Sequence, residues 1–172
     1  MPMYLYLGDI TRMETDAIVN AAGTDLRRCP GICDAIFAAA DTAELERACR
    51  KLGRCRIGQA VATPGCGLPC RYIIHVAGPG WYGGEPRERF LLAGCYQNAL
   101  HKAYLCSCRR VAVPLIFSGD CHMPRAASLR VAGAAIADFC QRHPSMEVTL
   151  VLYRQSIYDM AKRILGWEDA PS

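Results

Sequence analysis

The chain has 172 residues, of which 52% are apolar and 21% are charged, and its formal net charge is +4. This length suits one domain and is too short for two of ordinary size, and the composition excludes a disordered chain. The basic excess is mild. It is compatible with an anionic ligand, but we expect no specific nucleic-acid partner.

The eleven cysteines raise the question of the redox compartment. The N-terminal segment MPMYLYLGDITRMETD lacks the basic region, apolar region and cleavage site of a signal peptide. The apolar runs are much shorter than the roughly 20 residues that span a membrane. We therefore expect a cytoplasmic protein without a membrane partner, whose thiols are free and mostly buried as small apolar side chains.

Strand and helix signals alternate along the chain. Short runs rich in apolar and β-branched residues predict strands at 3–7, 17–20, 58–63, 72–76, 111–116 and 146–153. Helical spacing and capping residues predict helices at 32–40, 43–52, 87–105, 125–140 and 156–165. This order predicts an α/β domain over about residues 1–167, with helices on both faces of a sheet and a short tail at 168–172.

Four predicted strand ends carry small or polar residues, and ligands of open α/β sheets bind at the carboxyl ends of strands. These ends are Gly8–Asp9–Ile10, the run from Asn20 to Gly23 with the Cys29–Pro30–Gly31 loop, the run Ser118–Gly119–Asp120–Cys121–His122, and Tyr153. A loop of small residues that opens a helix presents N–H groups to a phosphate. The pattern therefore predicts a nucleotide-like pocket.

Each of these residues has a structural alternative. Asp9 is equally suited to capping a turn. Asn20 is equally suited to satisfying backbone groups where a strand ends. Tyr153 has the alternative of packing in the core. His75, in the apolar run YIIHV, is expected to be a buried histidine with its hydrogen bonds satisfied.

The motifs at these positions resemble the macrodomain family over nearly the whole chain. They are, in order, GDIT, TDAIVNAA, GICDAIFAAA, G-x-A-x-x-T-P-G, LP-x-RYIIHVAGP, CYQNALHKA and VAVPLI-x-SG. The resemblance implies a three-layer α/β/α fold with a central mixed sheet of about six strands. It also implies binding of ADP-ribose or an ADP-ribosylated protein, without a cofactor. Some members hydrolyse ADP-ribosyl groups from protein side chains or deacetylate O-acetyl-ADP-ribose, and others only bind.

The resemblance also implies roles for individual residues. Asp9 would accept a hydrogen bond from the adenine amino group beside the Ile10 N–H, and Tyr153 would lie next to the adenine. Asn20, with Ala22 nearby, would lie near the distal ribose. The first phosphate loop would contain Gly31, Ile32 and Cys33, and the second would contain Ser118, Gly119, Asp120 and Cys121.

The sequence departs from the family pattern in both loops. The usual NAAN is NAAG, so that Gly23 replaces an Asn linked to catalysis, and the glycine-rich run is reduced to Arg28–Cys29–Pro30–Gly31. The Asp that often follows aligns with Cys33, and Asp34 lies one position later. Cys121 replaces an aromatic residue of the second loop. These changes leave open another nucleotide, such as ADP or an NAD derivative.

Three functions follow from this pattern. The first is an ADP-ribosyl hydrolase in which Asp120, or else Asp34, activates a water molecule, with Asn20 near the distal ribose. The second is a non-catalytic reader of ADP-ribose. The third is a thiol or zinc site formed by Cys29, Cys33, Cys121 and His122, but C-x₃-C is not a typical zinc spacing, and we expect no metal.

Overall fold

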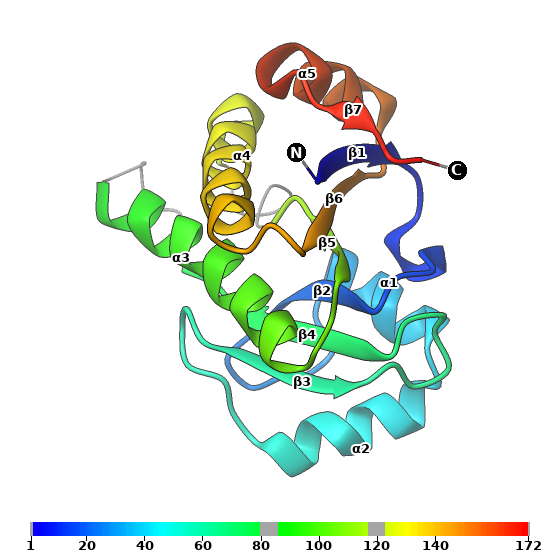
Figure 1. Cartoon of the computed structure of the whole chain (residues 1–172). Coiled ribbons are helices and arrows are strands. Elements are labelled where there is room, and N and C mark those ends of the chain that lie inside the picture. Colours follow the sequence, from blue (N-terminus) through cyan, green and yellow to red (C-terminus); the bar gives the residue numbers. More distant parts are fainter. Residues whose placement is uncertain (1, 80–85, 117–122, 172) are drawn as a thin grey trace.

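The strands of the chain form one mixed sheet (Figure 1). The structure is a computed structural model that describes residues 2–79, 86–116 and 123–171. Within those residues the sheet has seven strands in the order β3-β4-β2-β5-β6-β1-β7, and β3 runs antiparallel to β4 while the other pairs are parallel. The strands are β1 (Met3–Leu7), β2 (Ala17–Ala22), β3 (Ala60–Pro64), β4 (Tyr72–Ala77), β5 (Arg110–Pro114), β6 (Glu147–Leu152) and β7 (Glu168–Asp169).

Helices cover both faces of the sheet (Figure 1). They are η1 (Ile10–Arg12, a 3-10 turn), α1 (Ile32–Ala39), α2 (Thr42–Leu52), α3 (Pro86–Leu105), α4 (Arg125–Arg142) and α5 (Gln155–Leu165). Alternate residues of the central strand β4 enter different cores. In β4, Ile74 and Val76 pack with α3, α4 and α5, whereas Ile73 and Ala77 pack with α1 and α2. The expected three-layer α/β/α fold is therefore confirmed.

The seventh strand is the difference from the expected sheet of about six. β7 is only two charged residues long, and it pairs with β1 through Tyr4 with Glu168 and Leu5 with Asp169. Such a segment has neither alternation nor strand-forming residues, so nothing in its sequence predicts a strand. It is extended because the edge of β1 offers backbone partners.

β2 and β5 are not paired toward their carboxyl ends. These strands pair only through Ala17 with Val111 and Ile18 with Ala112, whereas β5 follows β6 as far as Pro114 opposite Val151. Pro114 has no N–H to donate to β2. The strand predicted at 111–116 ends at Pro114, and the sheet is open between the ends of β2 and β5.

The turn between β3 and β4 depends on a glycine. A Cβ atom at Gly65 would lie 2.0 Å from the backbone oxygen of Cys70. The Gly65 N–H donates to the carbonyl of Arg71 at 2.8 Å, so the turn cannot open without losing this bond. We expect Gly65→Ala to lower the free energy of unfolding by about 2 kcal/mol, as overpacking does.

The control for this prediction is Gly94→Ala in α3, where an added Cβ meets no heavy atom within 4 Å. Alanine is favoured over glycine by about 1 kcal/mol inside a helix, so this variant should be as stable as the parent or more stable. Urea unfolding of the two variants measures the difference. Equal stability of both variants would contradict the steric argument for Gly65.

Candidate functional site

A cavity of about 440 Å³ opens beyond the ends of β1, β5 and β6. One wall comes from η1 and α1 and carries Asp9, Ile10, Gly31 and Ile32. The other wall comes from the β5 and β6 ends and the first residues of α4 and α5. Because these helices cover opposite faces of the sheet, the cavity lies at the sheet edge between the two layers.

Asp9 has one carboxylate oxygen fixed by its own turn. Its Oδ1 accepts from the Thr11 N–H at 2.9 Å and from the Thr11 hydroxyl at 2.7 Å, so Asp9 caps η1. The capping role considered from the sequence is therefore confirmed. The same residue also lines the cavity. Its carboxylate, held in one orientation, is suited to accept a hydrogen bond from a ligand amino group.

The beginning of α1 presents backbone rather than side chains to the cavity. Gly31 precedes the helix with φ +84°, a conformation that favours glycine, and it offers no side chain to cap the first turn. Ile32 follows it in the cavity wall. The N–H groups of a first helical turn lack partners within the helix, and the helix dipole favours an anion there.

Tyr153 lies at the opposite wall, directly after β6. Its side chain is 81% exposed and lines the cavity, so the alternative in which it packs in the core is wrong. The Gly8 N–H donates to the Leu152 carbonyl at 2.9 Å. This bond holds the β1 and β6 ends side by side and brings Asp9 and Tyr153 to the same cavity.

A row of buried polar side chains crosses three neighbouring strands below the first loop. The Asn20 amide donates to Nδ1 of His75 at 3.0 Å, and the other ring nitrogen of His75 lies 2.9 Å from the Thr63 hydroxyl. Because the amide nitrogen is only a donor, Nδ1 accepts and Nε2 carries the proton. His75 is thus a buried, satisfied histidine, as predicted. Within the described residues, the buried Oδ1 of Asn20 has no hydrogen-bond partner.

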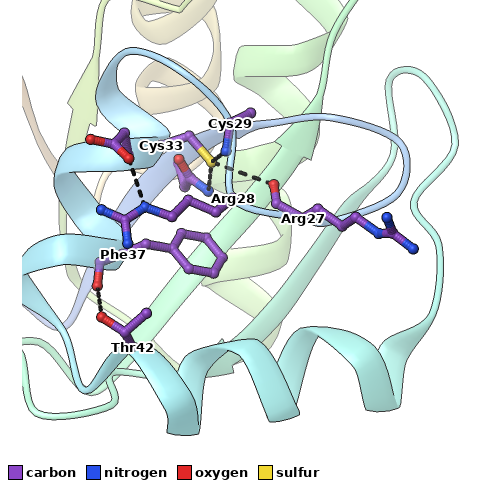
Figure 2. A network of polar contacts seen from close by, with 8 residues as sticks. Arg27, Arg28, Cys29, Cys33, Phe37 and Thr42 are labelled. Carbon is purple, nitrogen blue, oxygen red and sulfur yellow. Dashed lines mark hydrogen bonds and ion pairs between the residues drawn. The ribbon is translucent and has the colours of Figure 1, made fainter.

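The sulfur of Cys33 closes this row beneath the loop, and Figure 2 shows it at the centre of several contacts. It accepts from the Cys29 backbone N–H at 3.3 Å and from the Asn20 amide at 3.8 Å, and it lies 3.8 Å from the Arg27 carbonyl. The hydrogen bond with the Cys29 thiol, together with these N–H donors, lowers the pKa of Cys33 to about 7. The same thiol contact raises the pKa of Cys29.

Comparison with known proteins identifies the family. The family model for the Macro domain matches residues 19–132. The chain belongs to this family. It is 36% identical over 167 residues to an O-acetyl-ADP-ribose deacetylase of Cronobacter sakazakii, covering 94% of this chain and 92% of that protein.

Two solved macrodomains show the same fold. The Oceanobacillus iheyensis macrodomain with ADP aligns with a TM-score of 0.88 at 31% identity, covering 94% of this chain and 88% of that one. The Trypanosoma brucei macrodomain in complex with ADP-ribose aligns with a TM-score of 0.87 at 26% identity, covering 96% of this chain and 69% of that one.

The structure of this macro domain brings only some of the predicted site residues to the cavity. Those that line it are Asp9, Ile10, Gly31, Ile32 and Tyr153. Asn20, Ala22 and Cys33 are buried beneath the first loop. The second-loop residues Ser118, Gly119, Asp120, Cys121 and His122 lie outside the described residues.

Asp34 lies on the outer side of the first loop. Its carboxylate accepts from Nε of Arg28 at 2.6 Å, and its side chain is 57% exposed. It is not among the residues that line the cavity. The ion pair ties the loop to the first turn of α1, a structural task that competes with a role in catalysis.

Sequence reasoning missed two arginines in the cavity wall, Arg125 at the start of α4 and Arg154 before α5. Both follow predicted site residues, Arg154 directly after Tyr153 and Arg125 three positions after His122. The composition gives a net positive charge but not its position in the fold. An arginine next to a predicted strand-end loop is the sequence signal that could have identified them as ligand-binding residues.

The described thiols are free, and all but Cys29 and Cys106 are buried. This confirms for them the expectation of small buried side chains. Among the described residues there is no group of three or more His, Cys, Asp or Glu arranged to hold a metal ion. No helix in the described ranges is long and apolar enough to cross a membrane.

The buried row predicts a pH dependence of stability. Burial lowers the pKa of His75 from 6.5 to about 4, so the folded state binds this proton less readily than the unfolded state does. The contribution of neutral His75 to the free energy of unfolding is fully present above about pH 6.5 and decreases as the pH falls toward 4. The loss should be about 3 kcal/mol at most.

Urea unfolding at pH 7 and pH 4.5 measures this effect in the parent and in His75→Gln. The glutamine does not titrate, so its variant should lose less stability between the two pH values, even if it is less stable at pH 7. Equal losses in the two proteins would contradict a neutral, buried His75.

Proposed function

We propose that this macro domain binds ADP-ribose, free or attached to a protein, in the cavity at the ends of β1, β5 and β6. The observation that carries the proposal is the arrangement of Asp9, the first turn of α1 and Tyr153 around one cavity. An acceptor for a base amino group and an aromatic ring match an adenine, and an anion-binding helix start matches a diphosphate, which are the two ends of an adenosine diphosphate.

The binding mode follows from the chemistry of each wall. The adenine lies between Asp9 and Tyr153, with its amino group donating to the carboxylate and its face against the exposed ring. The diphosphate lies against the N–H groups that follow Gly31. The bound ADP and ADP-ribose named for the Oceanobacillus and Trypanosoma macrodomains support this choice of ligand.

Asp9 gives the direct test of this mode. Asp9→Ala should weaken ADP-ribose binding about tenfold, because the adenine amino group loses a charged hydrogen-bond acceptor. Calorimetric titration with ADP-ribose measures the loss, with AMP as the second ligand.

The control is Asp41→Ala, which removes a comparable cap. The carboxylate of Asp41 accepts from the Glu44 N–H at the start of α2, and Asp41 does not line the cavity. This variant should lose stability and keep its affinity for ADP-ribose. A parent protein that binds neither ADP-ribose nor AMP would contradict the proposed function.

We propose further that the domain hydrolyses ADP-ribosyl or O-acetyl-ADP-ribose linkages, with Asp120 activating the water. The name of the Cronobacter relative supports this reaction class. Asp34 is the second candidate, and its ion pair with Arg28 makes it the weaker one. That ion pair, together with Gly23 in place of the catalytic asparagine, favours the alternative function of a non-catalytic reader.

Turnover of O-acetyl-ADP-ribose separates these functions. Asp120→Ala should reduce turnover at least about a hundredfold, the usual contribution of a general base, and should still bind ADP-ribose. Asp34→Ala is the matched variant: loss of turnover in it alone would transfer the catalytic role to Asp34. Saturable binding without turnover in the parent protein would establish the reader.

A further inference from the structure

Arg125 and Arg154 give one wall of the cavity a positive charge. We propose that Arg125 and Arg154 form a second anion site, which binds a phosphate on the adenine-side ribose of the ligand. The preferred ligand is then an ADP-ribose that carries an additional phosphomonoester on that ribose. This inference rests on the proposed binding of ADP-ribose and specifies which form is bound.

The first argument is that both guanidinium groups lack a protein counter-charge. Within the described residues, four arginines form ion pairs with carboxylates, and what sets Arg125 and Arg154 apart from the other unpaired arginines is their place in the cavity wall. Neither Arg125 nor Arg154 is paired with a carboxylate in the part of the chain that the structure describes. The first turns of α4 and α5 contain no acidic residue.

The second argument is the balance of charge inside the cavity. Among its described lining residues, Asp9 is the acid, and one of its oxygens already accepts two hydrogen bonds from Thr11. Two full positive charges therefore share a cavity with one partly occupied carboxylate. Arginine binds a phosphate through parallel N–H donors, which matches three oxygens of a phosphomonoester.

The third argument is position. Arg154 follows Tyr153, and the bond from Gly8 to the Leu152 carbonyl places this segment beside Asp9. In the proposed mode the base occupies that end and the diphosphate reaches Gly31 on the other wall. The ribose that joins them must lie between, and its 2′ and 3′ hydroxyls are the groups left to face the arginine wall. ADP-ribose is uncharged there, whereas a 2′- or 3′-phosphate would pair with both guanidinium groups.

The experiment compares affinities by calorimetry at fixed ionic strength. ADP-ribose is titrated against 2′-phospho-ADP-ribose, and AMP against adenosine 2′,5′-bisphosphate and adenosine 3′,5′-bisphosphate. We expect the 2′- or the 3′-phosphorylated ligand to bind at least about tenfold tighter than its unphosphorylated counterpart, since a charge-assisted contact is gained. The two bisphosphates decide which hydroxyl carries the phosphate. No preference in either series would overturn the proposal.

The variants use the ratio of two affinities, which does not depend on how much protein is folded. In Arg125→Gln/Arg154→Gln the preference for the phosphorylated ligand should fall close to one. In Arg142→Gln, at the far end of α4 and paired with Asp138, the preference should be kept. A preference that survives unchanged in the double variant would overturn the assignment. So would an equal loss of affinity for both ligands, because it would place the arginines on the diphosphate instead.

Failure of this inference differs from failure of the proposed function. If ADP-ribose does not bind the parent protein, the proposed function is wrong. The bisphosphate series then tests the anion site by itself. Tighter binding of a bisphosphate than of AMP, lost in the double variant, supports the site, and equal binding of the bisphosphates and AMP overturns it.

Discussion

The site depends on the parallel pairing of β2, β5, β6 and β1. Parallel strands bring all their carboxyl ends to one edge, so segments distant in the sequence meet there. The Gly8 to Leu152 hydrogen bond extends this pairing one residue beyond β1 and fixes the relative position of Asp9 and Tyr153. The pairing of β2 with β5 ends at Ile18 opposite Ala112, which leaves the sheet open at the same edge. The cavity therefore lies where the strand register brings these segments together.

The regular elements could be predicted from the sequence because the apolar residues follow the periods of strands and helices. β4 alternates between two cores, and its six residues are almost entirely buried, which is why YIIHVA is so clear a signal. β7 could not be predicted, because its pairing comes from the exposed edge of β1 and not from its own residues. The burial of Asn20 was equally hidden, since it depends on how the Arg27–Cys33 loop folds over the end of β2.

The same reasoning found residues on both walls of the cavity but missed its two arginines. Asp9, Gly31 and Tyr153 occupy positions where any open α/β sheet places ligand groups. Arg125 and Arg154 belong to helix starts, and only the three-dimensional structure shows that these two helices begin at the same cavity as α1. The composition shows their positive charge, but it does not show that these side chains line the cavity.

The first loop illustrates how a structure can replace glycine-rich backbone with side-chain contacts. Gly31 alone keeps the positive φ at the start of α1. The preceding residues are held by the Cys33 sulfur from beneath and by the ion pair between Arg28 and Asp34 from outside. Figure 2 shows these restraints on one short segment. A loop fixed from both sides keeps the N–H groups of α1 available to a ligand without requiring the flexibility that additional glycines would bring.

The helices that begin at the cavity differ from α2 in how their N-termini are capped. α2, which does not border the cavity, has its own acid cap in Asp41 and an acidic residue in its first turn. α1, α4 and α5, which begin at the cavity, have no side-chain cap, and α4 and α5 each place an arginine at that end instead. A positively charged side chain beside the positive end of a helix dipole is unfavourable in the absence of an anion. The arrangement costs stability in the empty protein, and in the proposed binding mode a bound polyanion removes that cost, so the charges that weaken these helix starts would also select the ligand.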